Sequence, residues 1–377
     1  MSLQPSSHPP PRRLAILGLV AFLLLGLLYP ILGPALPTLS SQFGLQAIGA
    51  SWLISLNSAG AVLGVLLAGG LASRWSARQR ALLAVMLLGL GGVGLALASN
   101  FALALLASCW LGVGFGMLDL TVNVWLSTSY AERSAAMLNL LSASFGVGAV
   151  LAPLAVGSAG GNFRLPLLCC VGLAALLGLL LLTMPRVSAQ VEAPSLTPLV
   201  GRSRLILGGF MGLFLAYVAV EGGVGTWEVT HLQDSLGLTT GAASQISAWF
   251  WVAFTLGRLI SAPLTLRVAP AVLIPCALIL AALSLALAAI PAAAPWAYTL
   301  TGLFLAPVFT TGLVWLTQVL PGSAAPTRVF AGAFIGPVVF APVIGALRDG
   351  YGPTAIPLTL MGIALLAFVL TLWLRRV

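Results

Sequence analysis

Three ionisable side chains lie well inside long apolar stretches of this sequence: Asp119, Glu221 and Arg258. A charge in hydrocarbon costs several kcal/mol, so each must face a cavity, meet a partner or be neutralised. Asp119 could carry a proton, form a permanent ion pair with Arg258, or contact a solute. Glu221 precedes the run Gly222-Gly-Val-Gly225, which predicts a broken helix and a gate beside an acid. The alternative is that Glu221 lies in an outer polar zone, with Glu228 beyond it.

Uncharged polar and aromatic residues in the same stretches could bind a polyhydroxylated solute. Amide and hydroxyl groups bond sugar hydroxyls, and aromatic faces pack against the C–H side of a sugar ring. The alternative is that the polar residues join helices and the aromatic residues mark the membrane interface. Tyr29 and Pro30 predict a kinked helix that lines a cavity. The candidates for solute contact are Tyr29, Asn57, Asn123, Asn139, Tyr217, Gln245, Trp251, Thr311 and Trp315.

Other chemistry has little support in the sequence. His8 and His231 are the two histidines, the four cysteines fall in apolar stretches, and no glycine-rich phosphate loop is present. We therefore expect no enzyme activity, no metal, no cofactor and no direct use of ATP. Energy must come from an ion gradient, H⁺ or Na⁺, or from the gradient of the solute itself.

These side chains must be positioned by helices in a membrane. The chain of 377 residues is 60% hydrophobic and 6% charged, too few polar residues to cover a soluble core. Apolar windows predict an all-α membrane protein with twelve spans, each long enough to cross about 30 Å of hydrocarbon. The predicted spans are 14–37, 48–72, 81–99, 103–126, 135–158, 164–185, 205–226, 243–266, 270–291, 297–320, 329–347 and 353–374.

Charge placement predicts the orientation. The basic residues are all arginines and most lie in alternate gaps between spans, whereas the opposite gaps hold Arg164 and Arg348. This asymmetry predicts a multi-pass protein of the inner (plasma) membrane with both termini in the cytoplasm. The net charge of +9 is then a signal of topology, and we expect the lipid bilayer, not nucleic acid, to be the partner.

Internal repeats divide the spans into two sets of six. Trp52 and Gly60 in the second span match Trp249 and Gly257 in the eighth, and Gly112 in the fourth matches Gly302 in the tenth. The sequence predicts two pseudo-symmetric six-helix bundles. The predicted parts are a disordered N-terminus 1–13, a first bundle 14–185, a cytoplasmic linker 186–204 and a second bundle 205–377.

The loop after the second span, Gly69-Gly-Leu-Ala-Ser-Arg-Trp-Ser-Ala-Arg78, resembles the cytoplasmic motif of the major facilitator superfamily. Ser73 stands where an aspartate is usual, and Arg74 and Arg78 remain as cytoplasmic gate candidates. The resemblance covers essentially the whole chain and implies a substrate site between the two bundles near the midplane.

A narrower resemblance rests on four segments of the sequence. They are Gly112 to Asn123, Leu138-Asn139, Tyr217 to Trp227, and Gly257-Arg258. Together they are similar to the sugar branch of that superfamily, which contains the fucose–proton symporter and sodium-dependent glucose transporters. The branch has an acid four residues before an asparagine in the fourth helix, as Asp119 and Asn123 have here.

We therefore expect a monomeric secondary transporter that moves a small polar solute, a sugar, by alternating access. Asp119 is expected to carry the coupling proton, with Glu221 and Arg258 as electrostatic partners. One alternative is a drug or metabolite exporter of the same superfamily, favoured by a Gly-Pro pattern in the fifth span. Another is a membrane receptor or scaffold that transports nothing.

Overall fold

The computed structural model describes residues 12–130, 133–184, 201–265, 267–321, 328–329 and 332–376. Arg12 and Arg13, expected to be disordered, begin the first helix, and the end of the expected linker already belongs to a helix that starts at Arg202. The rest of the expected N-terminal segment and of the linker lies outside the described residues.

The described secondary structure is helical. The N-terminal group comprises α1 Arg12–Leu28, α2 Leu32–Phe43, α3 Ala47–Gly70, α4 Ala77–Ala96, α5 Phe101–Tyr130, α6 Ser134–Ser158 and α7 Arg164–Leu182. The C-terminal group comprises α8 Arg202–Leu236, α9 Thr240–Leu264, α10 Pro270–Ala288, the 3₁₀ turn η2 Pro291–Ala293, α11 Ala294–Val319, α13 Ile335–Tyr351 and α14 Ala355–Leu374.

The helix lengths fit a polytopic membrane protein. Within the described residues, nine helices are long and apolar enough to cross a membrane, and the bent pair α1 and α2 is a tenth. Helices α9 and α13 lie at the two remaining predicted windows, so the helix order is consistent with the twelve predicted spans. The main difference is α8, whose 35 residues continue well beyond the predicted end at 226.

The first span is broken at Tyr29–Ile31. Helices α1 and α2 meet there at 41°. Pro30 has no N–H to donate and its ring disfavours a continuous helix, which accounts for the break at this point. The predicted kink is confirmed, and it leaves the Tyr29 side chain at the level where the two groups of helices meet.

The glycine run after Glu221 does not break its helix. Helix α8 is continuous from Arg202 to Leu236, so the prediction of a broken helix is wrong. The glycines instead make room for neighbours. A Cβ on Gly222 would lie 3.0 Å from the Tyr29 hydroxyl, and one on Gly225 would lie 2.7 Å from the Trp251 ring.

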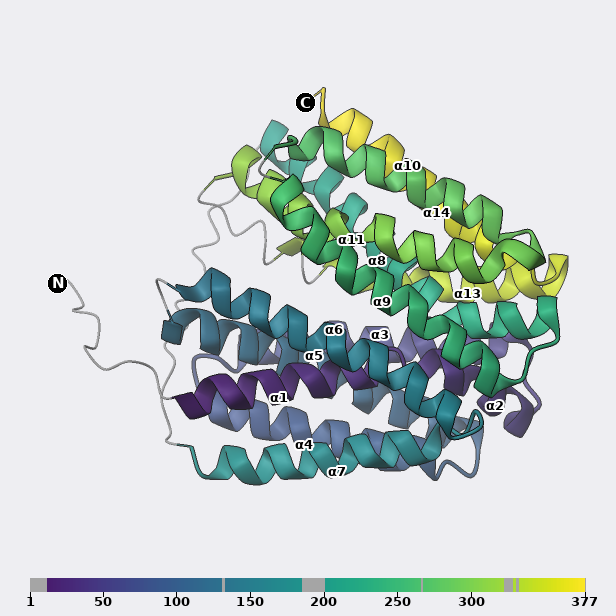
Figure 1. The fold of residues 1–377 in the computed structure, drawn as a ribbon. Coiled ribbons are helices and arrows are strands. Elements are labelled where there is room, and N and C mark those ends of the chain that lie inside the picture. Colours follow the sequence, from purple (N-terminus) through teal and green to yellow (C-terminus); the bar gives the residue numbers. More distant parts are fainter. Residues whose placement is uncertain are drawn as a thin grey trace.

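The helices form two bundles that lie one above the other in Figure 1, with the described ends Arg12 and Arg376 toward the same side. We call that side the terminal end and the opposite side the far end. Within the N-terminal group α5 packs on α3 and α4, and within the C-terminal group α11 packs on α9 and α10. Between the groups, α3 packs on α13, α6 on α9, and α2 on α8.

The repeated glycines make the same crossing in both groups. A Cβ on Gly60 or Gly112 would collide with backbone carbonyls across the α3–α5 contact, and one on Gly257 or Gly302 would collide across α9–α11. The paired tryptophans also match, since Trp52 is 50% exposed and Trp249 60% exposed. Small residues let helix backbones approach closely in a membrane, so the sequence repeat corresponds to a packing repeat.

The two groups touch at the far end and part toward the terminal end. Gly146 of α6 faces Thr255 of α9. On the same face of α6, Ser142 lies one turn and Asn139 two turns nearer the terminal end than Gly146, and both are exposed. On α9, Leu259 lies one turn nearer the terminal end than Thr255 and is also exposed. The surfaces that meet at mid-depth therefore diverge toward the terminal end, as the ribbons in Figure 1 also do.

Gly112→Ala is expected to destabilise the protein, because its methyl group would meet the Asn57 carbonyl across α3–α5. Overpacking of this kind costs about 1–3 kcal/mol. Gly89→Ala on α4 is the matched control, since a Cβ there has no neighbour within 4 Å. Thermal unfolding in detergent measures both. Equal melting temperatures for the two variants would contradict this account of the crossing.

Candidate functional site

A cluster of aromatic and charged residues lies where the broken first span meets the C-terminal group. Its members, the central cluster, are Tyr29 from the break, Tyr217 and Glu221 from α8, and Trp251, Phe254 and Arg258 from α9. The Tyr29 and Trp251 rings meet edge to face with centroids 5.8 Å apart. The Arg258 guanidinium carbon lies 4.4 Å above the Phe254 ring, a cation–π contact.

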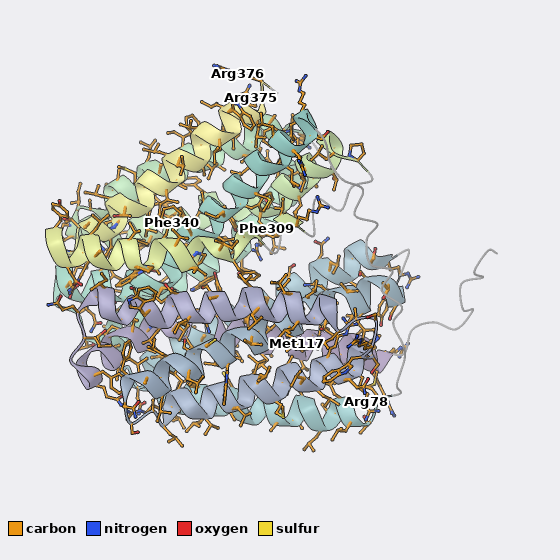
Figure 2. All side chains as sticks on the ribbon, turned by 180° about the vertical axis from the view of Figure 1, so that it is seen from behind. Arg78, Met117, Phe309, Phe340, Arg375 and Arg376 are labelled. Atoms are coloured by element: carbon orange, nitrogen blue, oxygen red, sulfur yellow. The ribbon has the colours of Figure 1, made fainter. Side chains whose placement is uncertain are left out.

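The N-terminal group supplies the other aromatic neighbours of Tyr29. Its ring lies 5.7 Å from Phe115 of α5 and 5.9 Å from Phe145 of α6, measured between centroids. Phe115 in turn meets Phe334, at 6.3 Å. In the C-terminal group Tyr217 packs against Phe309, which faces the N-terminal group in Figure 2. Aromatic rings from both groups thus surround one point at mid-depth.

Several polar atoms around this point are buried and make no hydrogen bond of standard geometry among the described residues, although the Tyr217 hydroxyl lies beside Glu221 and Arg258. These atoms are the Tyr217 hydroxyl, the Trp251 Nε1, the Thr255 hydroxyl and the Arg258 Nε. A buried polar group left unpaired costs about 1–3 kcal/mol. A polar ligand at this point would supply the missing partners, so these atoms mark the candidate binding site.

Glu221, not Asp119, is the carboxylate near Arg258. Glu221 is 8% exposed, and the charges of Glu221 and Arg258 both act on Tyr29 and Tyr217. The alternative of an Asp119–Arg258 ion pair is wrong for this structure, because the ion pairs of the described residues join Arg348 to Asp234 and Asp349. The outer polar zone is also wrong for Glu221, since its helix buries it at mid-depth.

Asp119 lies in the N-terminal group, one turn from Phe115 on the same face of α5. It is 8% exposed and accepts a hydrogen bond of 3.0 Å from the Asn123 amide. Asn123 can bond Asp119 because residues four positions apart lie next to each other on the surface of a helix. Asp119 therefore faces the region between the groups, on the side that opens toward the terminal end.

The structure does not bring all the predicted solute contacts together. Asn57 donates to the Ser108 carbonyl at 2.9 Å, which joins α3 to α5. Gln245 packs beside Gly157 in the α6–α9 contact nearer the far end. Trp315 packs on Phe210 at 5.2 Å, within the C-terminal group. Their positions fit helix packing. Tyr217 belongs to the central cluster. Thr311 is buried within the C-terminal group, and its hydroxyl makes no hydrogen bond of standard geometry among the described residues. Asn139 is exposed on α6, nearer the terminal end.

The two gate candidates after α3 lie at the terminal end. Arg78 donates to the Met184 carbonyl at 2.7 Å, which ties α4 to the end of α7, and Arg74 is exposed. Figure 2 shows Arg78 at the same end as Arg375 and Arg376. Their contacts lie within the N-terminal group, so their gating role stays a prediction.

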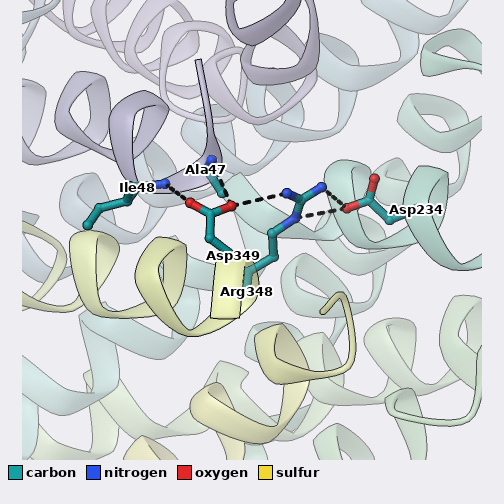
Figure 3. A network of polar contacts seen from close by, with 5 residues as sticks. All are labelled: Ala47, Ile48, Asp234, Arg348 and Asp349. Atoms are coloured by element: carbon teal, nitrogen blue, oxygen red, sulfur yellow. Dashed lines mark hydrogen bonds and ion pairs between the residues drawn. The ribbon is translucent and has the colours of Figure 1, made fainter. Parts of the chain in front are cut away.

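An ion-pair network that the sequence analysis missed joins the groups at the far end (Figure 3). Asp349 of α13 accepts hydrogen bonds from the first N–H groups of α3, from Ala47 at 3.1 Å and from Ile48 at 2.8 Å. Arg348 bonds Asp349 at 3.1 Å and Asp234 of α8 at 2.7 Å. An acid at a helix N-terminus is stabilised by the unpaired N–H groups and the helix dipole. The adjacent Arg348-Asp349 pair at the end of a span was the available signal.

A surface groove lies away from the central cluster. A cavity of about 570 Å³ runs between α13 and α14, lined by residues such as Phe340, Leu358 and Leu366. Its walls are apolar and contain none of the central cluster. We regard it as a lipid-facing groove, because a polar solute would find few partners there.

More than half of the chain matches a known protein family by sequence. The profile described as Major Facilitator Superfamily covers residues 14–227. The chain belongs to this superfamily. The family consists of transporters, not enzymes, which agrees with the absence of catalytic groups expected from the sequence.

Relatives and solved structures agree with this assignment. The arabinose-proton symporter of Escherichia coli (strain K12) is 29% identical over 170 residues, 43% of this chain and 36% of that protein. The match thus spans about a third of that relative's length. Three solved structures share the fold at low identity. They are a D-xylose-proton symporter (TM-score 0.78, 14% identical, 96% and 97% covered), the nucleoside transporter NupG (0.77, 17%, 97% and 99%) and FucP, in an outward conformation (0.63, 17%, 96% and 98%).

Asp349→Asn is expected to loosen the far end, because the amide loses the charge and one of the two acceptor oxygens facing α3. Hydrogen bonds to charged groups contribute about 1.5–3 kcal/mol, so opening should rise about tenfold or more. The readout is maleimide labelling of Ser55→Cys, a buried position whose serine bonds the Val338 carbonyl of α13. The background lacks the four native cysteines.

Arg164→Gln is the matched control. Arg164 also lies at the far end, but its bond of 2.8 Å to Gln42 stays within the N-terminal group. It should leave the labelling rate unchanged. If Asp349→Asn labels no faster than Arg164→Gln, the network does not hold the groups together.

Proposed function

We propose that the protein is a proton-coupled secondary transporter of a small polyhydroxylated solute, a sugar, and that it acts as a monomer. The observation that supports this most directly is the set of unpaired buried polar atoms among the aromatic rings of the central cluster. A sugar offers what that point lacks, with hydroxyls for the polar atoms and a C–H face for the rings. The similarity to an arabinose-proton symporter favours the same solute class.

The proposed cycle is alternating access between the two bundles, 14–185 and 205–377. The far end is closed by contacts between the groups, and the terminal end is parted, so the site is reached from the terminal end in this state. Transport requires the reverse state, in which α6 and α9 close at the terminal end and α3 and α13 separate at the far end. Two discrete packings of this kind allow a solute to pass without an open channel.

Asp119 is the proposed proton carrier. Its carboxylate is buried beside the opening and bonded to Asn123, with no arginine paired to it among the described residues. An isolated buried acid can take and release a proton without first breaking an ion pair. Glu221 and Arg258 are proposed to change their mutual electrostatics when solute binds between them and Tyr29.

The proposed orientation places the terminal end in the cytoplasm of a cell with an inner membrane. Most described arginines, among them Arg74, Arg78, Arg375 and Arg376, lie at that end, whereas Arg164 and Arg348 lie at the far end. Cytoplasmic loops of membrane proteins carry such an excess of arginine. In this orientation the structure is open to the cytoplasm.

Asp119→Asn is expected to abolish proton-driven accumulation while solute exchange survives, because the amide cannot carry a proton but fills the same space. Proteoliposomes with an imposed pH gradient measure uptake of D-xylose, L-arabinose, uridine and a lipophilic cation. Counterflow without a gradient is the control for a folded carrier. Accumulation by Asp119→Asn equal to wild type would contradict the carrier role, and transport of the lipophilic cation instead of sugars would favour an exporter.

Tyr217→Phe is expected to weaken sugar binding about fivefold, or ~1 kcal/mol, because it removes a hydroxyl offered to the solute. Stability should fall little, since that hydroxyl lies beside Glu221 and Arg258 but makes no hydrogen bond of standard geometry among the described residues. Ligand-induced shifts in melting temperature measure affinity. Tyr351→Phe, at an exposed ring on α13, is the matched control. Unchanged affinity in Tyr217→Phe would place the solute elsewhere.

A further inference from the structure

A second buried carboxylate lies inside the C-terminal group, apart from the central cluster. Glu228 follows Glu221 by two turns of α8, about 10 Å nearer the far end. Its neighbours are Ser247 of α9 and Tyr298 of α11, both buried. The apolar window predicts a span that ends at 226 and leaves Glu228 outside it, but Glu228 is 1% exposed. That interpretation is wrong because α8 extends ten residues past the predicted end of the span.

Glu228 has no charge partner in the part of the chain that the structure describes. Both carboxyl oxygens lack a hydrogen bond of standard geometry, and the ion pairs of the described residues involve Arg348 alone among the basic groups. An unpaired buried carboxylate is too costly to persist as an anion. The side chain must therefore be neutralised in this state.

The ionisable groups on the packed helices cannot neutralise it. On α8 itself the nearer groups are Tyr217, Glu221, His231 and Asp234, whereas Arg202 and Arg204 lie at the opposite end of the helix, six or more turns away. On α11 the group is Tyr298. Arg258 of α9 lies three turns beyond Ser247, in the central cluster. Arg348 of α13 is held by two aspartates, and α2 and α14 contribute no ionisable residue between their described bounds.

A bound proton satisfies this environment better than a metal cation. A cation such as Na⁺ would need several oxygen ligands, whereas the side-chain groups that interact with Glu228 from α9 and α11 are the Ser247 and Tyr298 hydroxyls. Tyr298 is already engaged, with its hydroxyl 3.0 Å from His231 Nδ1. A neutral carboxyl group needs neither a counter-charge nor a coordination shell.

His231 gives Glu228 a polar neighbour on the side of the far end. It lies one turn beyond Glu228, is fully buried, and has its Nε2 unpartnered among the described residues. One turn further on α8 is Asp234, whose side chain is 27% exposed. Ionisable groups thus follow one another from the far-end surface to Glu228.

We propose that Glu228 is a second proton-binding site, occupied in this state and reached from the far end past His231. Its part in coupling rests on the proposed transport function; its occupancy by a proton does not. Loss of the proton would leave an anion among α8, α9 and α11, so release must accompany a rearrangement of these helices. Proton binding at Glu228 thereby favours the packing seen here, with the far end closed.

Infrared spectroscopy of the purified full-length protein near neutral pH tests the occupancy without any solute. A protonated carboxyl group gives a C=O stretching band separate from that of carboxylates. Glu228→Gln should remove intensity from this band, whereas Asp234→Asn, which removes an exposed ion-paired carboxylate, should not. An unchanged band in Glu228→Gln would overturn the proposal.

Thermal unfolding provides a second readout. Wild type should lose stability as the pH rises above about 4.3, the ordinary pKa of glutamate, because the unfolded chain then releases a proton that folded Glu228 still keeps. The loss should end where folded Glu228 itself gives up the proton. Glu228→Gln, an isostere of the neutral form, should remove part of that loss. Failure of Glu228→Gln to fold, or an unaltered pH profile, would contradict the proposal. If Asp119→Asn loses proton coupling but Glu228→Gln leaves the infrared band unchanged, the proposed transport function stands and the proton site at Glu228 is refuted. If Asp119→Asn keeps proton coupling but Glu228→Gln loses intensity in the infrared band, Asp119 is refuted as the proton carrier and the proton site at Glu228 stands.

Discussion

The dry interior of the bilayer constrains this structure more than any other factor. Water cannot pair with polar groups there, so each must be paired by protein, neutralised, or turned toward an internal space. Asp119, Glu221, Arg258 and Glu228 are all on helices that cross the apolar layer, and none is joined to another by an ion pair in the described chain. Their positions between helices follow from that constraint.

The contacts between the two groups divide by depth and by chemistry. At the far end they are charge-assisted hydrogen bonds from the first N–H groups of α3 to Asp349, which Arg348 pairs with inside the C-terminal group. At mid-depth they are aromatic and glycine-mediated, as at Tyr29, Trp251 and Gly225. Directional charge-assisted bonds are lost abruptly when a surface parts, whereas ring and glycine contacts tolerate sliding. The far-end network is therefore suited to define one closed state, and the rings to keep a site intact while helices move.

Periodicity and composition predicted the spans, the kink at Tyr29–Pro30 and the paired glycine crossings, because these depend on local properties of the chain. The α8 glycines were misread, since glycine permits a break but also permits close approach, and only the neighbours Tyr29 and Trp251 decide between them. Glu228 was missed because hydropathy underestimates a span that carries polar residues packed inward. The partner of Arg258 could not be predicted, because it depends on which helices meet.

The break in the first span divides it between two sets of neighbours. Helix α1 packs on α5, α6 and α7 of its own group, whereas α2 packs on α8 and α9 as well as on α3. Helix α2 is part of the N-terminal group in sequence, yet it packs largely against the C-terminal group. Any relative rotation of the two groups must be taken up as torsion in the three residues Tyr29–Ile31, or must peel α2 from α8. Tyr29 is thus the aromatic ring whose orientation reports directly on that torsion.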